Sequence, residues 1–186
     1  EAAKYINIDP TAYAVLSAED LKKSQAGDES INGGKPFVPD VKTALDGAKD
    51  ILAEEFSEIA PLLAKLRDFL WSQGFMTSQV VSGQEMAEEE KFRDYYAYSE
   101  PIRLVPSHRA LALFRGRQLG VLQLKLSLGE SQESLVPHPC EEMIAKHVGI
   151  EQLGRAADQW LAEVCRWTWR VKTSLSLEMA LFTQLR

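Results

Sequence analysis

The sequence has few cysteines, no long apolar run and no basic-then-apolar leader pattern at its start. Its two cysteines, Cys140 and Cys165, are too few and too far apart for a disulfide framework, which suits a reducing compartment. No uninterrupted apolar run approaches the roughly eighteen residues that a membrane-spanning helix needs. We therefore expect a cytoplasmic protein without a membrane span or a secretory leader.

Compact catalytic and metal-binding motifs are also missing. His108 lies beside Ser107 and near Glu100, but adjacent helical residues point in different directions, which argues against a nucleophile–base–acid set. His138-x-Cys140 and His147 offer zinc-type ligands without CxxC or HxxxH spacing. The Gly-Gly pair near the start lacks the helix and lysine of a phosphate-binding loop. We predict no catalytic site, no metal and no cofactor, although a dispersed hydrolase site stays open.

Helical periodicity is what the sequence does have. The chain of 186 residues is 45% hydrophobic, enough to bury a good core in one or two compact units. The pattern predicts a mainly α, multihelical bundle with a long C-terminal helix and one or two short β segments. The predicted helices span residues 40–56, 58–73, 91–96, 107–115, 137–148 and 156–186, and the candidate strands span 75–81 and 121–126.

The C-terminal helix is the longest predicted element. It contains no Gly or Pro from residue 156 to residue 186 and would be about 45 Å long at 1.5 Å per residue. Apolar side chains recur along one side at helical steps, which predicts a buried stripe against which shorter helices pack. The predicted stripe consists of Trp160, Val164, Trp167, Val171, Leu175 and Phe182, and it is widened by Leu161, Thr168 and Leu181.

The helix at 107–115 follows a proline and carries several basic residues. Ser107 is the predicted N-cap, and Gly116 is expected to end the helix in the left-handed conformation. Ala110, Leu111 and Phe114 recur at helical spacing and are expected to face a core. The arginines of this segment need water, a carboxylate or a phosphate, so we expect one buried side and one cationic side.

Several blocks of sequence resemble the bacterial Tex proteins, which are transcription accessory factors. They are D-V-K-T-A-L-D-G-A-K-D-I-L-A-E at 40–54, L-R-D-F-L-W-S-Q-G at 66–74, K-F-R-D-Y-Y-A-Y-S-E-P at 91–101, its continuation through P-S-H-R-A-L-A-L-F-R-G-R at 106–117, and W-T-W-R-V-K at 167–172. The resemblance covers roughly residues 40–186 and residues 1–7. Between residues 8 and 37 the sequence departs from the family pattern, so no family property is transferred there.

The resemblance implies a domain organisation. Residues 1–39 are expected to be the end of a preceding helix plus an inserted flexible segment, and residues 40–186 a Tex-type N-terminal helical domain. Because the chain lacks an initiator Met and its last helix has no stop signal, we expect a fragment of a longer multidomain protein. Family members continue into an RNase H-like domain, helix-hairpin-helix elements and an RNA-binding OB-fold, none of which is visible here.

Charge is unevenly distributed along the chain. The net charge is −6, yet residues 91–125 hold seven Lys or Arg against Asp94 and Glu100, a local +5, which leaves −11 for the remainder. Basic residues interleaved with aromatics are typical of surfaces that bind nucleic-acid backbones. The nucleic-acid-binding candidates are Arg103, His108, Arg109, Arg115, Arg117 and Lys125.

Two functions follow as alternatives. The resemblance implies a non-enzymatic protein that binds nucleic acid, RNA or DNA, mainly through its absent C-terminal domains, with the transcription machinery as a possible partner. This fragment would be a scaffold that orients those downstream domains, with a basic strip that contacts nucleic acid. The alternative is a protein–protein docking module in which the same arginines form ion pairs or solvated faces.

Overall fold

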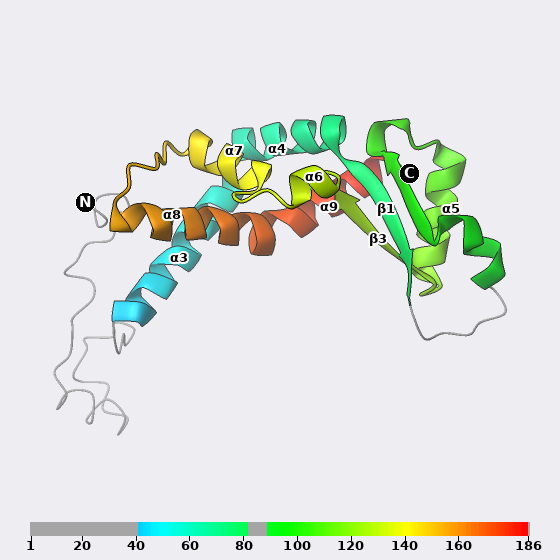
Figure 1. Cartoon of the computed structure of the whole chain (residues 1–186), viewed down its shortest axis with the longest axis horizontal. Helices are drawn as coiled ribbons and strands as arrows, with labels where there is room; N and C mark the ends of the chain where they lie inside the picture. Colours follow the sequence, from blue (N-terminus) through cyan, green and yellow to red (C-terminus); the bar gives the residue numbers. More distant parts are fainter. Residues whose placement is uncertain (1–40, 82–88, 186) are drawn as a thin grey trace, which may run out of the picture.

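The computed structural model describes residues 41–81 and 89–185, and Figure 1 shows an elongated molecule with helices along most of its length and a small sheet at one end. The predicted fold class, a mainly α bundle with a long C-terminal helix and little β structure, is confirmed. Asp40, the predicted N-cap of the first long helix, and the 1–39 segment lie outside the described residues. No helix in the described ranges is both long and apolar enough to cross a membrane.

Two helices lead into the sheet. Helix α3 spans Val41–Glu58 and α4 spans Ala60–Gln73, with a proline in the first turn of α4 as predicted. Gly74 caps α4 by donating its N–H to the Leu70 carbonyl at 2.8 Å. A Cβ at Gly74 would lie 2.3 Å from that carbonyl oxygen, so a side chain does not fit at this junction.

The sheet has three antiparallel strands in the order β2-β1-β3: Phe75–Val80 (β1), Ala97–Pro101 (β2) and Leu122–Ser127 (β3). The sequence predicted β1 and β3 and their pairing, in which Thr77 lies opposite Lys125. It missed β2, where Ala97 and Ser99 give no apolar alternation. The helix predicted at residues 91–96, just before β2, is a 3₁₀ helix that spans Glu89–Tyr95.

The two faces of the sheet differ. Leu122 and Leu124 of β3 are buried on the face that α5 (Ser107–Gln118) covers, while Gln123 and Lys125 are exposed on the other face. Strand β3 is an edge strand in the described sheet, and its Leu126 N–H donates to the Glu178 carboxylate at 2.8 Å.

Helix α5 differs from its prediction at both ends. Pro106 is the N-cap and no side chain caps the helix, so the predicted capping by Ser107 is wrong. Gly116 lies inside the helix rather than ending it. A Cβ there would lie 2.6 Å from Leu122 Cδ1. Glycine at this position is what lets α5 approach β3 closely, and the left-handed glycine is Gly120 instead.

Two further helices precede the C-terminal one. The short α6 spans Glu130–Glu133, and α7 spans Pro139–His147 with the left-handed Gly149 after it, as predicted. His138 caps α7, because its Nδ1 accepts from the Cys140 N–H at 3.2 Å. His138 and Cys140 therefore have a structural explanation, and the described residues hold no cluster of His, Cys, Asp and Glu suited to a metal ion.

The C-terminal helix consists of α8 (Ala156–Trp167), a π-helical segment (Thr168–Thr173) and α9 (Ser174–Gln184). The π segment interrupts the α-helical phase: Thr173 Oγ1 donates to the carbonyl of Thr168, five residues earlier, at 3.1 Å. In Figure 1 this helix runs beneath α4 and is crossed by α3. Lys172 of the π segment forms an ion pair with Glu54 of α3 at 2.5 Å.

The π segment corrects the predicted buried stripe. A step of five residues from Thr168 to Thr173 replaces the usual three or four, so the buried face continues through a different set of positions. Val164 and Phe182 are buried as predicted, whereas Trp167, Val171 and Leu175 are 37%, 52% and 66% exposed. Leu161, Thr168 and Leu181, which widen the predicted stripe, are buried as predicted, and Cys165, Thr173 and Leu177 join them in the core.

Candidate nucleic-acid interface

The six predicted contact residues lie around the sheet end of the molecule, but not on one surface. His108 and Arg115 are seven residues apart on α5, which is two helical turns, and both are exposed on the same outward face. Arg103 is exposed in the 3₁₀ turn Ile102–Leu104 just before α5. Lys125 is exposed on the opposite face of the sheet from α5, so it does not join the other five.

Arg109 is held by an internal network. Its Nη1 donates to Glu100 Oε2 at 2.6 Å, and the Tyr98 hydroxyl donates to the same oxygen. The hydrogen bond from Tyr98 and then that from Arg109 hold the pKa of Glu100 below its usual value, although burial opposes this. Burial, and then the bond to Glu100, raise the pKa of Tyr98 to about 12. Arg109 of α5 therefore binds Glu100 of β2 and helps to hold β2 against α5.

Arg117 is also engaged with its own protein. Its guanidinium lies over the rings of Phe114 and Phe182, at 5.7 and 5.8 Å from the two centroids. Those two rings meet edge to face at 5.9 Å, so Arg117 covers the contact between α5 and α9. A guanidinium stacked in this way stabilises the junction of the two helices, and recruiting it to a phosphate would weaken that junction.

Of the six predicted residues, Arg103, His108 and Arg115 remain exposed on the α5 side without a described internal role. They share the surface with exposed leucines, and Leu104 and Leu111 are 60% and 57% exposed. The exposure of Leu111 corrects the prediction that it faces the core: Ala110, Leu113 and Phe114 fill that face instead. The outward face of α5 therefore mixes cations with apolar side chains.

A second surface was not predicted from the sequence. On the C-terminal helix, apolar side chains four residues apart face outward, and we call these the apolar stripe: Trp167, Val171, Leu175 and Met179. Lys49 of α3 lies over the Trp167 ring at 5.0 Å, so that end is partly covered. The T-W-R-V-K-T pattern of the π segment carried no periodicity that could have signalled the change of face.

Comparison with known proteins identifies the family. Residues 19–186 match the family model described as Tex central region-like. The chain belongs to the Tex family. It is 42% identical to Protein tex of Bordetella pertussis over its whole length, which covers 24% of that protein, and 49% identical to Protein YhgF of Escherichia coli over 80% of its length. It is 38% identical over 96% of its length to the Transcriptional accessory protein Tex of Neisseria gonorrhoeae.

These Tex relatives are much longer than the chain. It spans about a quarter of the Bordetella and Neisseria proteins and 19% of the Escherichia coli protein. The family match begins at residue 19, inside the 8–37 segment that the sequence pattern set apart. The domain boundary between residues 1–39 and 40–186 stays a prediction. The six nucleic-acid-binding candidates also stay predictions.

Proposed function

We propose that this chain is a non-enzymatic helical scaffold of a transcription accessory protein, and that its apolar stripe docks another domain of the same longer protein. The observation that carries this is the outward exposure of Val171, Leu175 and Met179 at 52%, 66% and 51% on a helix whose other side is fully packed. Soluble proteins seldom leave such a row uncovered, and larger apolar patches mark interaction sites. Relatives about four times as long supply candidate partners in the same chain.

The energetics favour docking within one chain. Burial of each large apolar side chain contributes roughly 1.5–3 kcal/mol. Three such side chains would contribute too little for tight association between separate molecules, which loses translational and rotational freedom. A domain tethered to the scaffold avoids most of that loss through its high effective concentration.

The docking proposal is tested in a full-length Tex protein in which this chain replaces the matching residues. Hydrogen exchange of residues 170–180 is compared between that protein and the isolated chain, where we expect slower exchange in the longer protein. Leu175→Glu should abolish the added protection without unfolding the isolated chain, while Lys125→Glu on the sheet face should leave it intact. Equal exchange in the two proteins would refute docking through the apolar stripe.

Nucleic-acid contact is the second candidate, and we place it on Arg103, His108 and Arg115. The relative named as a transcriptional accessory protein supports an association with transcription, and hence a cytoplasmic site of action. The exposed basic side chains beside Leu104 and Leu111 are placed to bind phosphate while an apolar side chain contacts a base. RNA contact through further domains, which the family resemblance implies, would add to this surface.

Salt dependence tests the second candidate. Binding of the chain to a labelled single-stranded oligonucleotide is measured at several salt concentrations, and removal of one phosphate-binding side chain should reduce the slope of log K against log salt by about 0.7–1. Arg103→Glu and Arg115→Glu should each do so, whereas Lys125→Glu should not. Absence of binding at low salt, or equal effects of all three changes, would refute this surface.

A further inference from the structure

A groove of about 500 Å³ lies between the edge strand β3 and the C-terminal helix. Residues 123–128 form one side of this groove, and the π segment and α9 form the other. Trp169, Arg170 and Glu178 are among the residues that line the helical side. Leu175 belongs both to this groove and to the apolar stripe, so the two surfaces are continuous.

Every second residue of β3 directs its backbone away from β1 and toward the free edge. In an antiparallel pair, residues that exchange N–H···O bonds with the partner strand alternate with residues that do not. The Val81 N–H donates to the Val121 carbonyl at 3.0 Å, so the odd-numbered residues of β3 bond to β1. The even-numbered residues, which include Leu124 and Leu126, therefore direct their N–H and C=O groups to the free edge.

Carboxylates already occupy two of the even-numbered amides on this side of the chain. The Leu126 N–H donates to Glu178 at 2.8 Å, and the Leu128 N–H donates to Glu133 at 2.9 Å. The Leu124 N–H has no such acceptor in the part of the chain that the structure describes. Because both carboxylates line the groove, the Leu124 N–H in the same row faces it as well. A strand edge with a free N–H and C=O can pair with a further strand.

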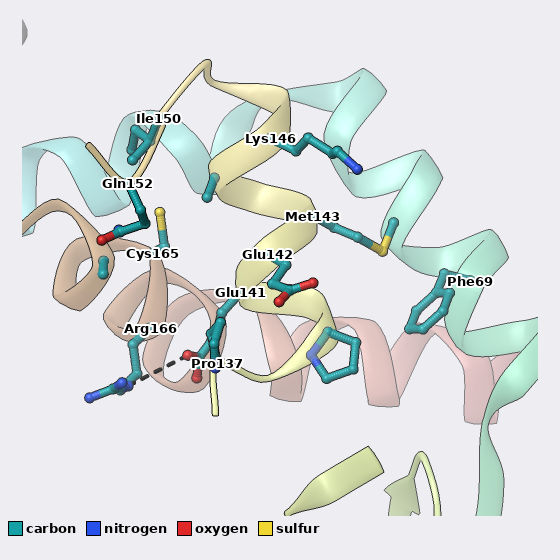
Figure 2. A pocket seen from close by; sticks show the side chains of 13 residues that line it. Phe69, Pro137, Glu141, Glu142, Met143, Lys146, Ile150, Gln152, Cys165 and Arg166 are labelled. Atoms are coloured by element: carbon teal, nitrogen blue, oxygen red, sulfur yellow. Dashed lines mark ion pairs between the residues drawn. The ribbon is translucent and has the colours of Figure 1, made fainter. Parts of the chain in front are cut away.

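The basic side chains of the groove are less engaged than its carboxylates. Lys125 is exposed and has no ion pair among the described residues. Arg170 shares the single Glu141 carboxylate with Arg166, and the two Nε atoms lie 3.6 Å and 3.5 Å from its oxygens. Figure 2 shows the Glu141–Arg166 pair at the wall of a separate cavity of about 440 Å³ between α4, α7 and α8. Two guanidinium groups against one carboxylate leave a positive charge, so an acidic side chain fits the groove better than a basic one.

We propose that this groove binds a short extended segment from another part of the longer Tex protein, which pairs with Leu124 as a fourth strand of the sheet. This proposal rests on the docking within one chain proposed above, and it specifies the docked segment. The segment accepts from the Leu124 N–H and donates to the Leu124 C=O. Its residue opposite Leu124 shares that apolar face of the sheet, and its adjacent residues lie on the Lys125 face, because side chains alternate along a strand. We therefore expect an apolar residue in the segment next to an acidic one.

Amide exchange in the unaltered chain tests whether this edge is open and then covered. Exchange of Gln123, Leu124 and Lys125 is measured by mass spectrometry at single-residue resolution, in the isolated chain and in a full-length Tex protein that contains it. After correction for intrinsic rates, Leu124 should exchange at least about tenfold faster than its two neighbours in the isolated chain, because only the neighbours bond to β1. In the full-length protein this ratio should fall by at least about fivefold. An equal ratio in the two proteins, or a Leu124 amide as slow as its neighbours in the isolated chain, would overturn the proposal.

Two variants at one position test the acidic side chain of the segment. Lys125→Glu reverses the charge and should return the Leu124 exchange in the full-length protein to within about twofold of its rate in the isolated chain. Lys125→Arg keeps the charge and should preserve the slow exchange. Because Lys125 is exposed, we expect both variants to fold. Slow exchange of Leu124 in both variants would overturn the acidic partner.

The same measurement separates the strand from the proposed functions. Added protection of residues 170–180 without added protection of Leu124 would mean that the apolar stripe docks a domain without strand pairing, which overturns only the strand. Equal exchange of residues 170–180 in both proteins would refute the docking itself. Protection of Leu124 that appears only when an oligonucleotide is added would assign the groove to nucleic acid and overturn the protein segment.

Discussion

The two halves of the C-terminal helix use their surfaces differently. In α8 the packed face carries Leu161 and Val164, and the opposite face carries exposed polar residues such as Gln159 and Glu163. In α9 the packed face carries Leu177 and Leu181, yet its outward face also carries Leu175 and Met179, which are exposed. The first half is an ordinary amphipathic helix, whereas the second has apolar side chains on both sides.

The π segment between the halves explains the difference. Thr168 and Thr173 are both fully buried, although five residues separate them, because one turn of wider helix aligns them on one face. In a straight α-helix, a five-residue step would place them about 140° apart. One additional residue per turn thus decides which leucines of α9 enter the core and which face outward.

The largest expected effect comes from changing that residue count. Insertion of one alanine between Val171 and Lys172 should rotate α9 by about 100° and remove Leu177, Leu181 and Phe182 from the core. We expect a loss of more than about 4 kcal/mol in the free energy of unfolding, measured by urea titration followed by circular dichroism.

The matched control is a deletion. Removal of Val171, which is 52% exposed, should convert the π turn to an α turn and leave α9 in phase, at a cost of about 1 kcal/mol or less. If the insertion and the deletion destabilise the protein equally, the π segment does not set the phase of α9.

Truncation of one leucine on each face of α9 should give the next largest effect. Leu181→Ala removes a fully buried side chain and should cost about 2–5 kcal/mol, while Leu175→Ala removes a 66% exposed one and should change stability by about 0.5 kcal/mol or less. Thermal and urea unfolding of the two variants measure the difference. Similar losses would mean that Leu175 is packed as the sequence pattern predicted.

Loss of one hydrogen bond in the π segment should have a smaller effect. Thr173 Oγ1 bonds the carbonyls of Thr168 at 3.1 Å and Trp169 at 3.3 Å, and Thr173→Val removes these bonds while preserving shape. Because both carbonyls lie in the buried or partly buried helix turn, we expect a loss of about 1–2 kcal/mol in unfolding free energy. Thr183→Val, at an exposed position of α9, is the control and should change little.

The smallest effect concerns pH. His138 stacks on Trp169 of the π segment at 5.3 Å, and burial lowers the pKa of His138 below 6.5, outweighing the nearby Glu133 and Glu141. The unfolded chain therefore takes up the proton first, so stability should fall as pH drops below about 6.5, by at most about 1.4 kcal/mol per pH unit.

His138→Gln should flatten this dependence, as measured by the urea midpoint between pH 7 and pH 5. His108→Gln, which changes an exposed imidazole on α5, is the control. An unchanged slope in His138→Gln would show that another group carries the pH dependence in this range.

Local patterns predicted the elements well, and long-range packing explains most of what they missed. The helices α3, α4 and α7 and the strands β1 and β3 follow from apolar periodicity with proline and glycine signals at their ends. Strand β2 was missed because its register comes from β1 and from the Glu100 network with Arg109. The close packing of Gly116 against Leu122 is a contact between α5 and β3, and no local sequence pattern indicates it.

The candidate surfaces were less predictable. Sequence identified the cationic segment, but not that Arg109 and Arg117 are used internally while Lys125 lies on the other face of the sheet. Trp167, Val171 and Leu175 of the apolar stripe were assigned to the core because a straight α-helix was assumed, and the cavity between α4, α7 and α8 depends on three helices that meet only in the fold.

The bond from the Leu126 amide to Glu178 has a consequence for solubility. An exposed edge strand can form hydrogen bonds with a strand of another molecule. The Glu178 carboxylate accepts the hydrogen bond of one amide at the β3 edge, and it therefore blocks such pairing at this position. Because Glu178 lies in the middle of α9, detachment of that helix from the sheet would release the amide and expose the edge. Self-association should therefore begin with detachment of α9 and not with loss of the sheet.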